Sequence, residues 1–210
     1  MITLFVDRLW ESPYVYSCFV ALKEKGIPFE IEEVALEKGE HKTKAYQDRT
    51  IWGRVPAIDH DGFGLAESQA IIDYLEDAFP SSPRVLPNDA KERARARAVL
   101  GWIRSDLLDL RAERPTTSMF FDHAVKPLTD AGKAAVNRLF TIATRLLPSG
   151  KTQLFSEWSV ADADLALMLH RLILNDDEVP KNLLAFAEAQ WKRPSVEAFV
   201  NHPRPEWVPH

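Results

Sequence analysis

A short apolar run followed by a helix-start signal is the feature that most constrains this fold. The run Ile2–Val6 is apolar at all but one position, as expected for a strand covered on both faces. Ser12 and Pro13 follow it, and they are favoured at the N-cap and the first position of a helix. A strand that feeds a helix predicts an α/β unit, and the helix N-terminus favours a bound anion. Ser12 is therefore either a cap alone or a cap that also serves a ligand.

Apolar periodicity and turn residues predict the remaining elements of an N-terminal domain. Asp61-Gly62 lies between two short apolar runs and predicts a tight hairpin. Pro56 cannot donate a ladder hydrogen bond, so we expect it at an edge or at a strand start, where a cis bond is plausible. The expected order is a strand at 2–6, a helix from Pro13 to Gly26, a strand around Phe29 and Ile31, an irregular helical loop at 37–49, a hairpin of 55–58 and 63–66, and a helix at 71–79.

The character of the chain changes at a break rich in proline and serine between Pro80 and Asn88. Strand patterns stop there and helical periodicity follows. We predict domains at 1–80 and 89–210, joined by a linker at 81–88, with an α/β unit first and an all-helical bundle second. The helices of the second domain are expected at 89–113, 128–147, 160–174, 183–189 and 195–200, with a loop at 115–127.

Composition excludes several classes of function. The net charge of −5 argues against nucleic-acid binding, which usually needs a basic face. Cys18 is the only cysteine, so no intrachain disulfide forms, and the six histidines lack metal-ligand spacing. We therefore predict no metal. The N-terminus has no signal-peptide pattern and no apolar run is long enough to span a bilayer, so a cytoplasmic protein is expected.

Three features of the first domain fall at strand ends or helix starts. They are Ser12, the pair Val55-Pro56 before the third strand, and the pair Glu67-Ser68 after the fourth. Ligands of open α/β folds gather at such positions. Each feature alone is weak, since Ser12 and Ser68 are also explained as helix caps.

Together these motifs resemble those of the cytosolic glutathione transferase family, in its bacterial, serine-type form. The resemblance is carried by the segments Ser12-Pro13-Tyr14, Arg54-Val55-Pro56-Ala57, Glu67-Ser68-Gln69-Ala70-Ile71 and Ser159-Val160-Ala161-Asp162, and it covers nearly the whole chain. It implies a thioredoxin-like N-terminal domain and a helical-bundle C-terminal domain.

The resemblance also implies how glutathione would be held. Glu67 would accept from the ammonium of the γ-glutamyl end, and Ser68 would donate to its α-carboxylate. Gln69 would add a donor. The backbone of Val55, before a cis Pro56, would pair with the cysteinyl part as an added strand.

By the same resemblance, Ser12 would donate its hydroxyl proton to the glutathione sulfur and lower the pKa of that thiol, without becoming a covalent nucleophile. His41 would meet the glycine carboxylate, or else it is a solvated loop histidine. Relatives often carry a second polar ligand where this chain has Gly53, so Trp52 or Arg54 is a candidate substitute.

The implied activity is addition of the glutathione thiolate to a hydrophobic electrophile or a peroxide by a homodimer, in detoxification or oxidative stress. The alternatives are a glutathione-dependent peroxidase and a non-catalytic binding module of the same fold. An isomerase ranks low, because the first helix lacks a serine-rich run with a nearby cysteine. Glutathione is the expected co-substrate, and no nucleic acid or membrane partner is expected.

Other residues allow a functional or a structural interpretation. Trp10, Met119 and Phe120 are candidates for an apolar substrate wall, with core packing as the alternative. Cys18 lies well along its helix from Ser12, which favours a packed thiol. Ser159 and Asp162 form a capping-box pattern, with a structural role in a buried helix start.

Overall fold

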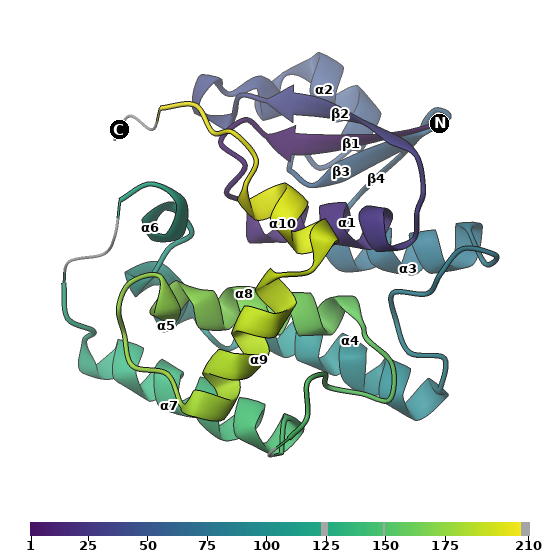
Figure 1. Cartoon of the computed structure of the whole chain (residues 1–210). Helices are drawn as coiled ribbons and strands as arrows, with labels where there is room; N and C mark the ends of the chain where they lie inside the picture. Colours follow the sequence, from purple (N-terminus) through teal and green to yellow (C-terminus); the bar gives the residue numbers. More distant parts are fainter. Residues whose placement is uncertain (123–125, 149, 207–210) are drawn as a thin grey trace. The chain divides into compact units, whose positions relative to one another are not determined.

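A computed structural model describes residues 1–122, 126–148 and 150–206. Contacts divide the chain into two compact units. Unit 1 comprises Met1–Val85 together with the C-terminal segment from Pro194, and unit 2 comprises Leu86–Arg193 (Figure 1).

Unit 1 is built on one four-stranded mixed sheet. Its strands are β1 (Ile2–Asp7), β2 (Phe29–Val34), β3 (Ala57–His60) and β4 (Phe63–Ala66), in the order β2-β1-β3-β4. β1 runs parallel to β2 and antiparallel to β3, and β3 runs antiparallel to β4 through the Asp61-Gly62 turn. The predicted hairpin and the predicted thioredoxin-like fold are therefore confirmed.

Helices cover both faces of this sheet (Figure 1). α1 packs on β1, α3 packs on β3 and β4, and α10 lies along α1, whereas α2 packs against β3 and β4 from the other side. Their bounds are α1 (Pro13–Glu24), the 3-10 turns η1 (Leu36–Lys38) and η2 (Glu40–Lys42), α2 (Lys44–Thr50), α3 (Ser68–Ala78) and α10 (Pro194–Val200).

The covered faces explain the sequence pattern of β1. Leu4, Phe5 and Val6 are fully buried, which a strand in the middle of a three-layer unit requires. β2 lies at the sheet edge, and its four central residues are exposed, which suits the three glutamates among them. The first helix ends as predicted near Gly26, whose φ of +64° suits glycine.

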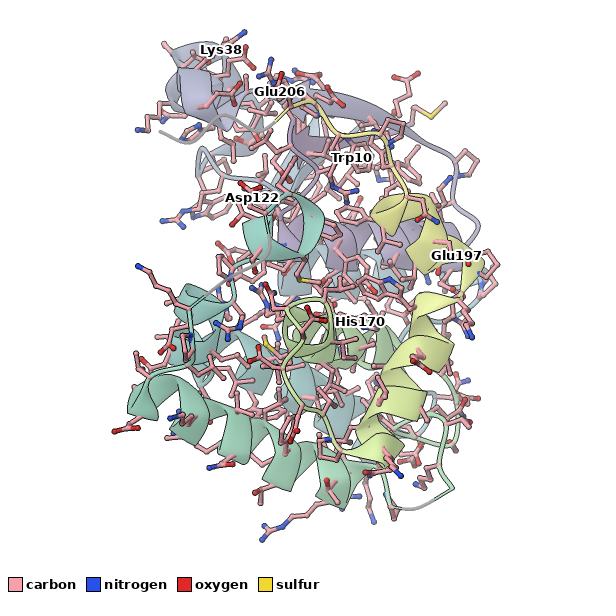
Figure 2. The ribbon with its side chains drawn as sticks, turned by 60° about the vertical axis from the view of Figure 1, so that its left-hand side comes forward. Trp10, Lys38, Asp122, His170, Glu197 and Glu206 are labelled. Carbon is pink, nitrogen blue, oxygen red and sulfur yellow. The ribbon has the colours of Figure 1, made fainter. Side chains whose placement is uncertain are left out.

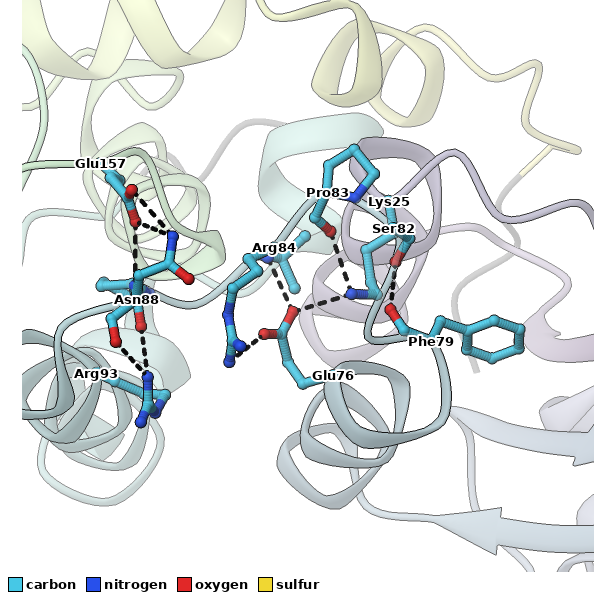
Figure 3. A network of polar contacts seen from close by, with 11 residues as sticks. Lys25, Glu76, Phe79, Ser82, Pro83, Arg84, Asn88, Arg93 and Glu157 are labelled. Atoms are coloured by element: carbon cyan, nitrogen blue, oxygen red, sulfur yellow. Dashed lines mark hydrogen bonds and ion pairs between the residues drawn. The ribbon is translucent and has the colours of Figure 1, made fainter.

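The buried carboxylate of Glu76 fixes the chain just before Val85, where the N-terminal part of unit 1 ends (Figure 3). Glu76 Oε1 accepts from Lys25 Nζ at 3.1 Å and from the backbone N–H of Val85 at 2.9 Å. Lys25 also donates to the carbonyl of Pro83, and Arg84 pairs with the Glu76 carboxylate at 2.7 Å. These bonds explain why unit 1 extends to Val85 instead of ending with α3.

The C-terminal segment joins unit 1, whereas the sequence prediction grouped it with the helices. The reason is aromatic packing: Phe199 of α10 is fully buried, with its ring centroid 5.3 Å from Tyr16 and 5.6 Å from Phe19 of α1. In unit 2, Asn88 bonds to the carboxylate of Glu157 (Figure 3). The compact units thus differ from the predicted limits of 1–80, 81–88 and 89–210 chiefly at the C-terminal end.

Unit 2 is helical throughout its described elements. α8 packs on α4 and α9, and its residues from Val160 to Leu172 are all buried, as its apolar sequence indicated. No helix among residues 1–122, 126–148 and 150–206 is long and apolar enough to cross a membrane. The bounds are α4 (Ala90–Ser105), α5 (Leu108–Glu113), α6 (Thr117–Phe120), α7 (Asp130–Leu146), α8 (Val160–Ile173) and α9 (Lys181–Trp191).

The prediction of a single helix at 89–113 was wrong, because the chain leaves the helical conformation between α4 and α5. Leu107 leaves the helical region with φ −103° and ψ 36°, and its side chain is fully buried. The indole N–H of Trp102 donates to Asp106 Oδ2 at 3.1 Å, which ties the end of α4 to the break. The helix thus ends where the buried position of Leu107 requires a non-helical backbone, although the apolar pattern of the sequence continues.

His170 is a buried titratable group in unit 2, on α8 (Figure 2). Its Nδ1 lies 2.9 Å from the carbonyl of Ala166, and its ring stacks on Trp191 at 3.7 Å. Burial lowers the pKa of His170 to about 4, against 6.5 in an unfolded chain. Between these values the unfolded state binds a proton that the folded state does not, so stability falls as the pH falls from 6.5 to 4.

We expect His170 to remove about 3 kcal/mol of unfolding free energy across that pH window. His170→Phe keeps a ring for stacking and removes the titration, so it should lose this part of the acid sensitivity. Urea unfolding of both proteins at pH 7 and pH 4.5 measures the difference. Parallel pH profiles for the two proteins would contradict the assignment.

Candidate functional site

Strand register brings the three sequence features to one end of the sheet in unit 1. Phe5 of β1 pairs with Ala57 of β3, and Ala57 pairs with Ala66 of β4, so these residues form one row across the sheet. Adjacent strands lie about 4.8 Å apart. The segment after β1, the segment before β3 and the segment after β4 therefore all emerge at the same end of the strands, which we call the sheet edge of the site. These segments carry Ser12, Val55-Pro56 and Glu67-Ser68 respectively.

Ser12 is the N-cap of α1, as predicted. Its Oγ accepts from the backbone N–H of Val15 at 3.3 Å. Asp7 Oδ1 accepts from the N–H of Ser12 at 3.2 Å, and Oδ2 accepts from the N–H of Glu11 at 2.8 Å. Burial raises the pKa of Asp7, and these amide bonds oppose the rise. The backbone N–H of Ser12 is thus engaged by Asp7, and its hydroxyl proton is the group suited to donate to a ligand.

The segment before β3 holds a cis peptide bond between Val55 and Pro56, as the sequence predicted. Pro56 is buried and directly precedes the strand. Tyr46 Oη donates to the carbonyl of Arg54 at 2.8 Å, which fixes the approach to this bond. Burial raises the pKa of Tyr46, so the phenol keeps its proton and remains a donor. The backbone that leads into Val55 is therefore anchored by Tyr46 directly before the cis peptide bond.

The segment after β4 turns sharply into α3. Glu67 is exposed and has a φ of +71°, a strained conformation for a residue other than glycine and one that is typical of functional sites. Ser68 is the first residue of α3 and is buried. Cys18 Sγ contacts the carbonyl of Ser68 at 3.8 Å and is fully buried, so the prediction of a packed thiol is confirmed. Gln69 follows and is half-buried.

His41 lies in η2 and comes close to Gly53. A side chain at Gly53 would place its Cβ 2.6 Å from the carbonyl oxygen of His41, and Gly53 has a φ of +57°. This close approach explains why the chain has no polar side chain there. His41 Nδ1 is buried and has no hydrogen-bond partner among the described residues. Trp52 and Arg54, the suggested substitutes, are both exposed.

Trp10 is a core residue of unit 1 and does not form an open substrate wall. Its side chain is 1% exposed and stacks on His202, with ring centroids 3.6 Å apart (Figure 2). Met119 is buried within unit 2 and Phe120 is half-buried. Sequence reasoning did not single out Asp7 or Arg204, although an acidic residue directly after an apolar run was a usable signal for the first.

The arrangement offers hydroxyl, carboxylate and backbone groups at one sheet edge and two helix starts. In the part of the chain that the structure describes, no group of three histidine, cysteine, aspartate or glutamate side chains is placed to hold a metal ion.

Two protein-family models match this chain. The model of the glutathione S-transferase N-terminal domain matches residues 11–78, and that of the C-terminal domain matches residues 89–203. The chain belongs to the glutathione S-transferase family. The resemblance noted in the sequence is thereby confirmed, and the two matched regions meet near the boundary between units 1 and 2.

Several glutathione S-transferase relatives resemble this chain. A Burkholderia glutathione transferase homologue, solved with bound glutathione, is 39% identical over 95% of this chain and 96% of that one, with a TM-score of 0.79. Human glutathione S-transferase theta-2 is 36% identical over 47% of this chain and 40% of that protein. A Ralstonia maleylpyruvate isomerase is 35% identical over 51% and 50% respectively. The chain thus matches half or less of the length of these two curated relatives.

Proposed function

We propose that this chain binds glutathione in unit 1 and uses Ser12 to lower the pKa of the glutathione thiol. The observation that carries the proposal is the register row, which gathers Ser12, Val55 and Glu67-Ser68 at one sheet edge. The Burkholderia homologue with bound glutathione supports it, because it is similar over nearly the whole chain.

The γ-glutamyl end of glutathione would lie at the start of α3. Glu67 is exposed at this edge, where its carboxylate would accept from the ligand ammonium. The hydroxyl and N–H of Ser68 would donate to the α-carboxylate at a helix N-terminus, with Gln69 beside them. The backbone of Val55 would pair with the cysteinyl residue as an added strand.

The glycine end would lie toward His41. The buried Nδ1 of His41, which has no partner among the described residues, supports this role, since a buried polar atom normally has a partner. The sulfur would then lie at the start of α1, within reach of the Ser12 hydroxyl. The hydroxyl donates to the thiolate, which raises the fraction of nucleophile near neutral pH.

The ionised sulfur would attack a hydrophobic electrophile, forming a carbon–sulfur bond as the leaving group departs. A peroxide is the alternative co-substrate, and a non-catalytic glutathione-binding module is the alternative outside catalysis. We also propose that the chain is cytoplasmic and forms a homodimer, and sedimentation of the purified chain tests the dimer.

Glu67→Ala is expected to weaken glutathione binding by about tenfold to a hundredfold, because a hydrogen bond to a charged group is worth roughly 1.5–3 kcal/mol. Isothermal titration of the wild type and the variant with reduced glutathione measures the loss. Glu30→Ala is the matched control, since Glu30 is an exposed glutamate of β2 at the same sheet.

The titration, together with activity assays, separates the alternatives. Binding that Glu67→Ala weakens, followed by conjugation of a chloroarene, supports the transferase. Turnover of a hydroperoxide without conjugation favours the peroxidase. No binding at millimolar glutathione would favour the non-catalytic module and remove the proposed site.

A further inference from the structure

A strained residue lies two positions before Ser12. Trp10 has a φ of +52°, in the left-handed region that bulky side chains avoid. Such a conformation is energetically unfavourable and persists only where surrounding contacts determine it. The conformation of Trp10 fixes the direction in which the chain enters Glu11 and Ser12. The contacts that hold Trp10 therefore also restrain the backbone position of Ser12.

Trp10 is restrained through both its backbone and its side chain. Its N–H donates to the carbonyl of Asp7 at 2.9 Å, and its own carbonyl accepts from Arg204 Nε at 3.2 Å and Nη2 at 2.9 Å. The indole N–H donates to Glu33 Oε1 at 2.8 Å, and the ring stacks on His202. Two of these restraints come from the C-terminal segment, about 190 residues away along the chain.

Arg204 is itself anchored at the end of α10. Its Nη1 donates to the carbonyls of Val200 at 2.8 Å and His202 at 3.0 Å, and its Nη2 donates to that of Phe199 at 3.2 Å. One planar guanidinium therefore joins the last turn of α10 to the carbonyl of Trp10. Because α10 packs on α1, this link connects the C-terminal segment to the turn that begins α1. A lysine cannot reproduce it, since its ammonium has no such fork.

Charge supports the same link. Burial lowers the pKa of Arg204 to about 10, and attraction by the carboxylates of Asp7 and Glu11, on either side of Trp10, opposes that lowering. Asp7 accepts from the amides of Glu11 and Ser12. The cation of Arg204 therefore offsets a buried negative charge that lies directly behind the Ser12 turn.

We propose that Arg204 is a positioning residue for Ser12, holding the carbonyl of Trp10 so that the Ser12 hydroxyl points at the glutathione sulfur. This inference rests on the proposed function. It differs from a purely structural fastening of the C-terminal segment, because it requires that the effect of Arg204 pass through the Ser12 hydroxyl.

A double-mutant cycle of Arg204→Leu and Ser12→Ala tests the inference. Arg204→Leu is expected to raise the pKa of the bound glutathione thiol by about one unit, which lowers kcat about tenfold near neutral pH. The dissociation constant of glutathione should stay within about twofold, since Arg204 makes no proposed contact with its ends. In the Ser12→Ala background, the same substitution should change neither quantity.

The matched control is Arg93→Leu, which removes a guanidinium that donates to the carbonyls of Pro87 and Asn88 in unit 2. It should leave both readouts at the wild-type level. If Arg204→Leu fails to fold, Arg204→Lys replaces it, with the same direction of change expected.

Two results would overturn the inference while leaving the proposed function intact. One is an unchanged thiol pKa in Arg204→Leu while Ser12→Ala raises it. The other is an equal effect of Arg204→Leu with and without the Ser12 hydroxyl. Failure of the wild type to bind glutathione would instead overturn the proposed function, and this inference with it.

Discussion

Asp162→Ala is expected to lower the free energy of unfolding by about 3–5 kcal/mol, the cost of breaking a buried polar network. The Asp162 side chain is fully buried at the start of α8. Its Oδ1 accepts from the N–H of Leu154 at 2.6 Å, and its Oδ2 accepts from the N–H of Ser159 at 2.9 Å and its Oγ at 3.2 Å. Alanine leaves two buried backbone N–H groups without partners.

Urea unfolding followed by circular dichroism measures this loss. Asp130→Ala is the matched control, because Asp130 is an exposed aspartate in the first turn of α7. The control should change stability by less than about 1 kcal/mol, the usual range for an exposed charge near a helix N-terminus. A melting temperature for Asp162→Ala equal to that of the wild type would remove the structural role of the capping box.

Ser12→Ala is expected to lower kcat for conjugation by at least about tenfold near neutral pH, because the pKa of the bound thiol rises by about one unit or more toward its free value. The Ser12 oxygen accepts from the N–H of Val15, which leaves its hydroxyl proton available as a donor to the sulfur. Ser12→Thr keeps the hydroxyl and should recover most of the activity. Steady-state kinetics with a chloroarene at saturating glutathione measures both variants.

The same substitution also removes a helix cap, which costs about 1 kcal/mol of stability. Thr129→Ala is the control for that cost, since Thr129 Oγ1 caps α7 by accepting from Gly132 at 3.3 Å and also donates to Glu113 Oε1 at 2.6 Å. It should lose at least as much stability and no activity. Full turnover in Ser12→Ala, together with loss of binding in Glu67→Ala, would mean that the site is right and the catalyst is another group.

Local signals predicted most of the fold. The strand at Ile2–Val6, the helix after Ser12, the hairpin at Asp61-Gly62 and the buried helix from Val160 all depend on patterns within a few residues. Each of these elements is present. The helix break at Leu107 and the attachment of α10 to unit 1 depend on which side chains become buried together. A local pattern does not contain that information.

The sequence predicted the individual residues of the candidate site but not the contacts that hold them in place. Ser12 and Ser68 are recognisable as helix starts, and Pro56 as a strand start. Arg204 was not recognisable, because it reaches Trp10 only through the packing of the C-terminal segment. The lack of a partner for His41 Nδ1 among the described residues and the crowding at Gly53 likewise depend on the tertiary approach of two loops.

The most direct test of the central claim is an ultraviolet titration of glutathione bound to the wild type and to Ser12→Ala. In the wild type we expect the pKa of the bound thiol to lie at least one unit below the free value of about 8.5. In Ser12→Ala we expect it to return most of the way to the free value. A bound thiol that titrates like free glutathione in the wild type, or an equally lowered pKa in both proteins, would contradict the account.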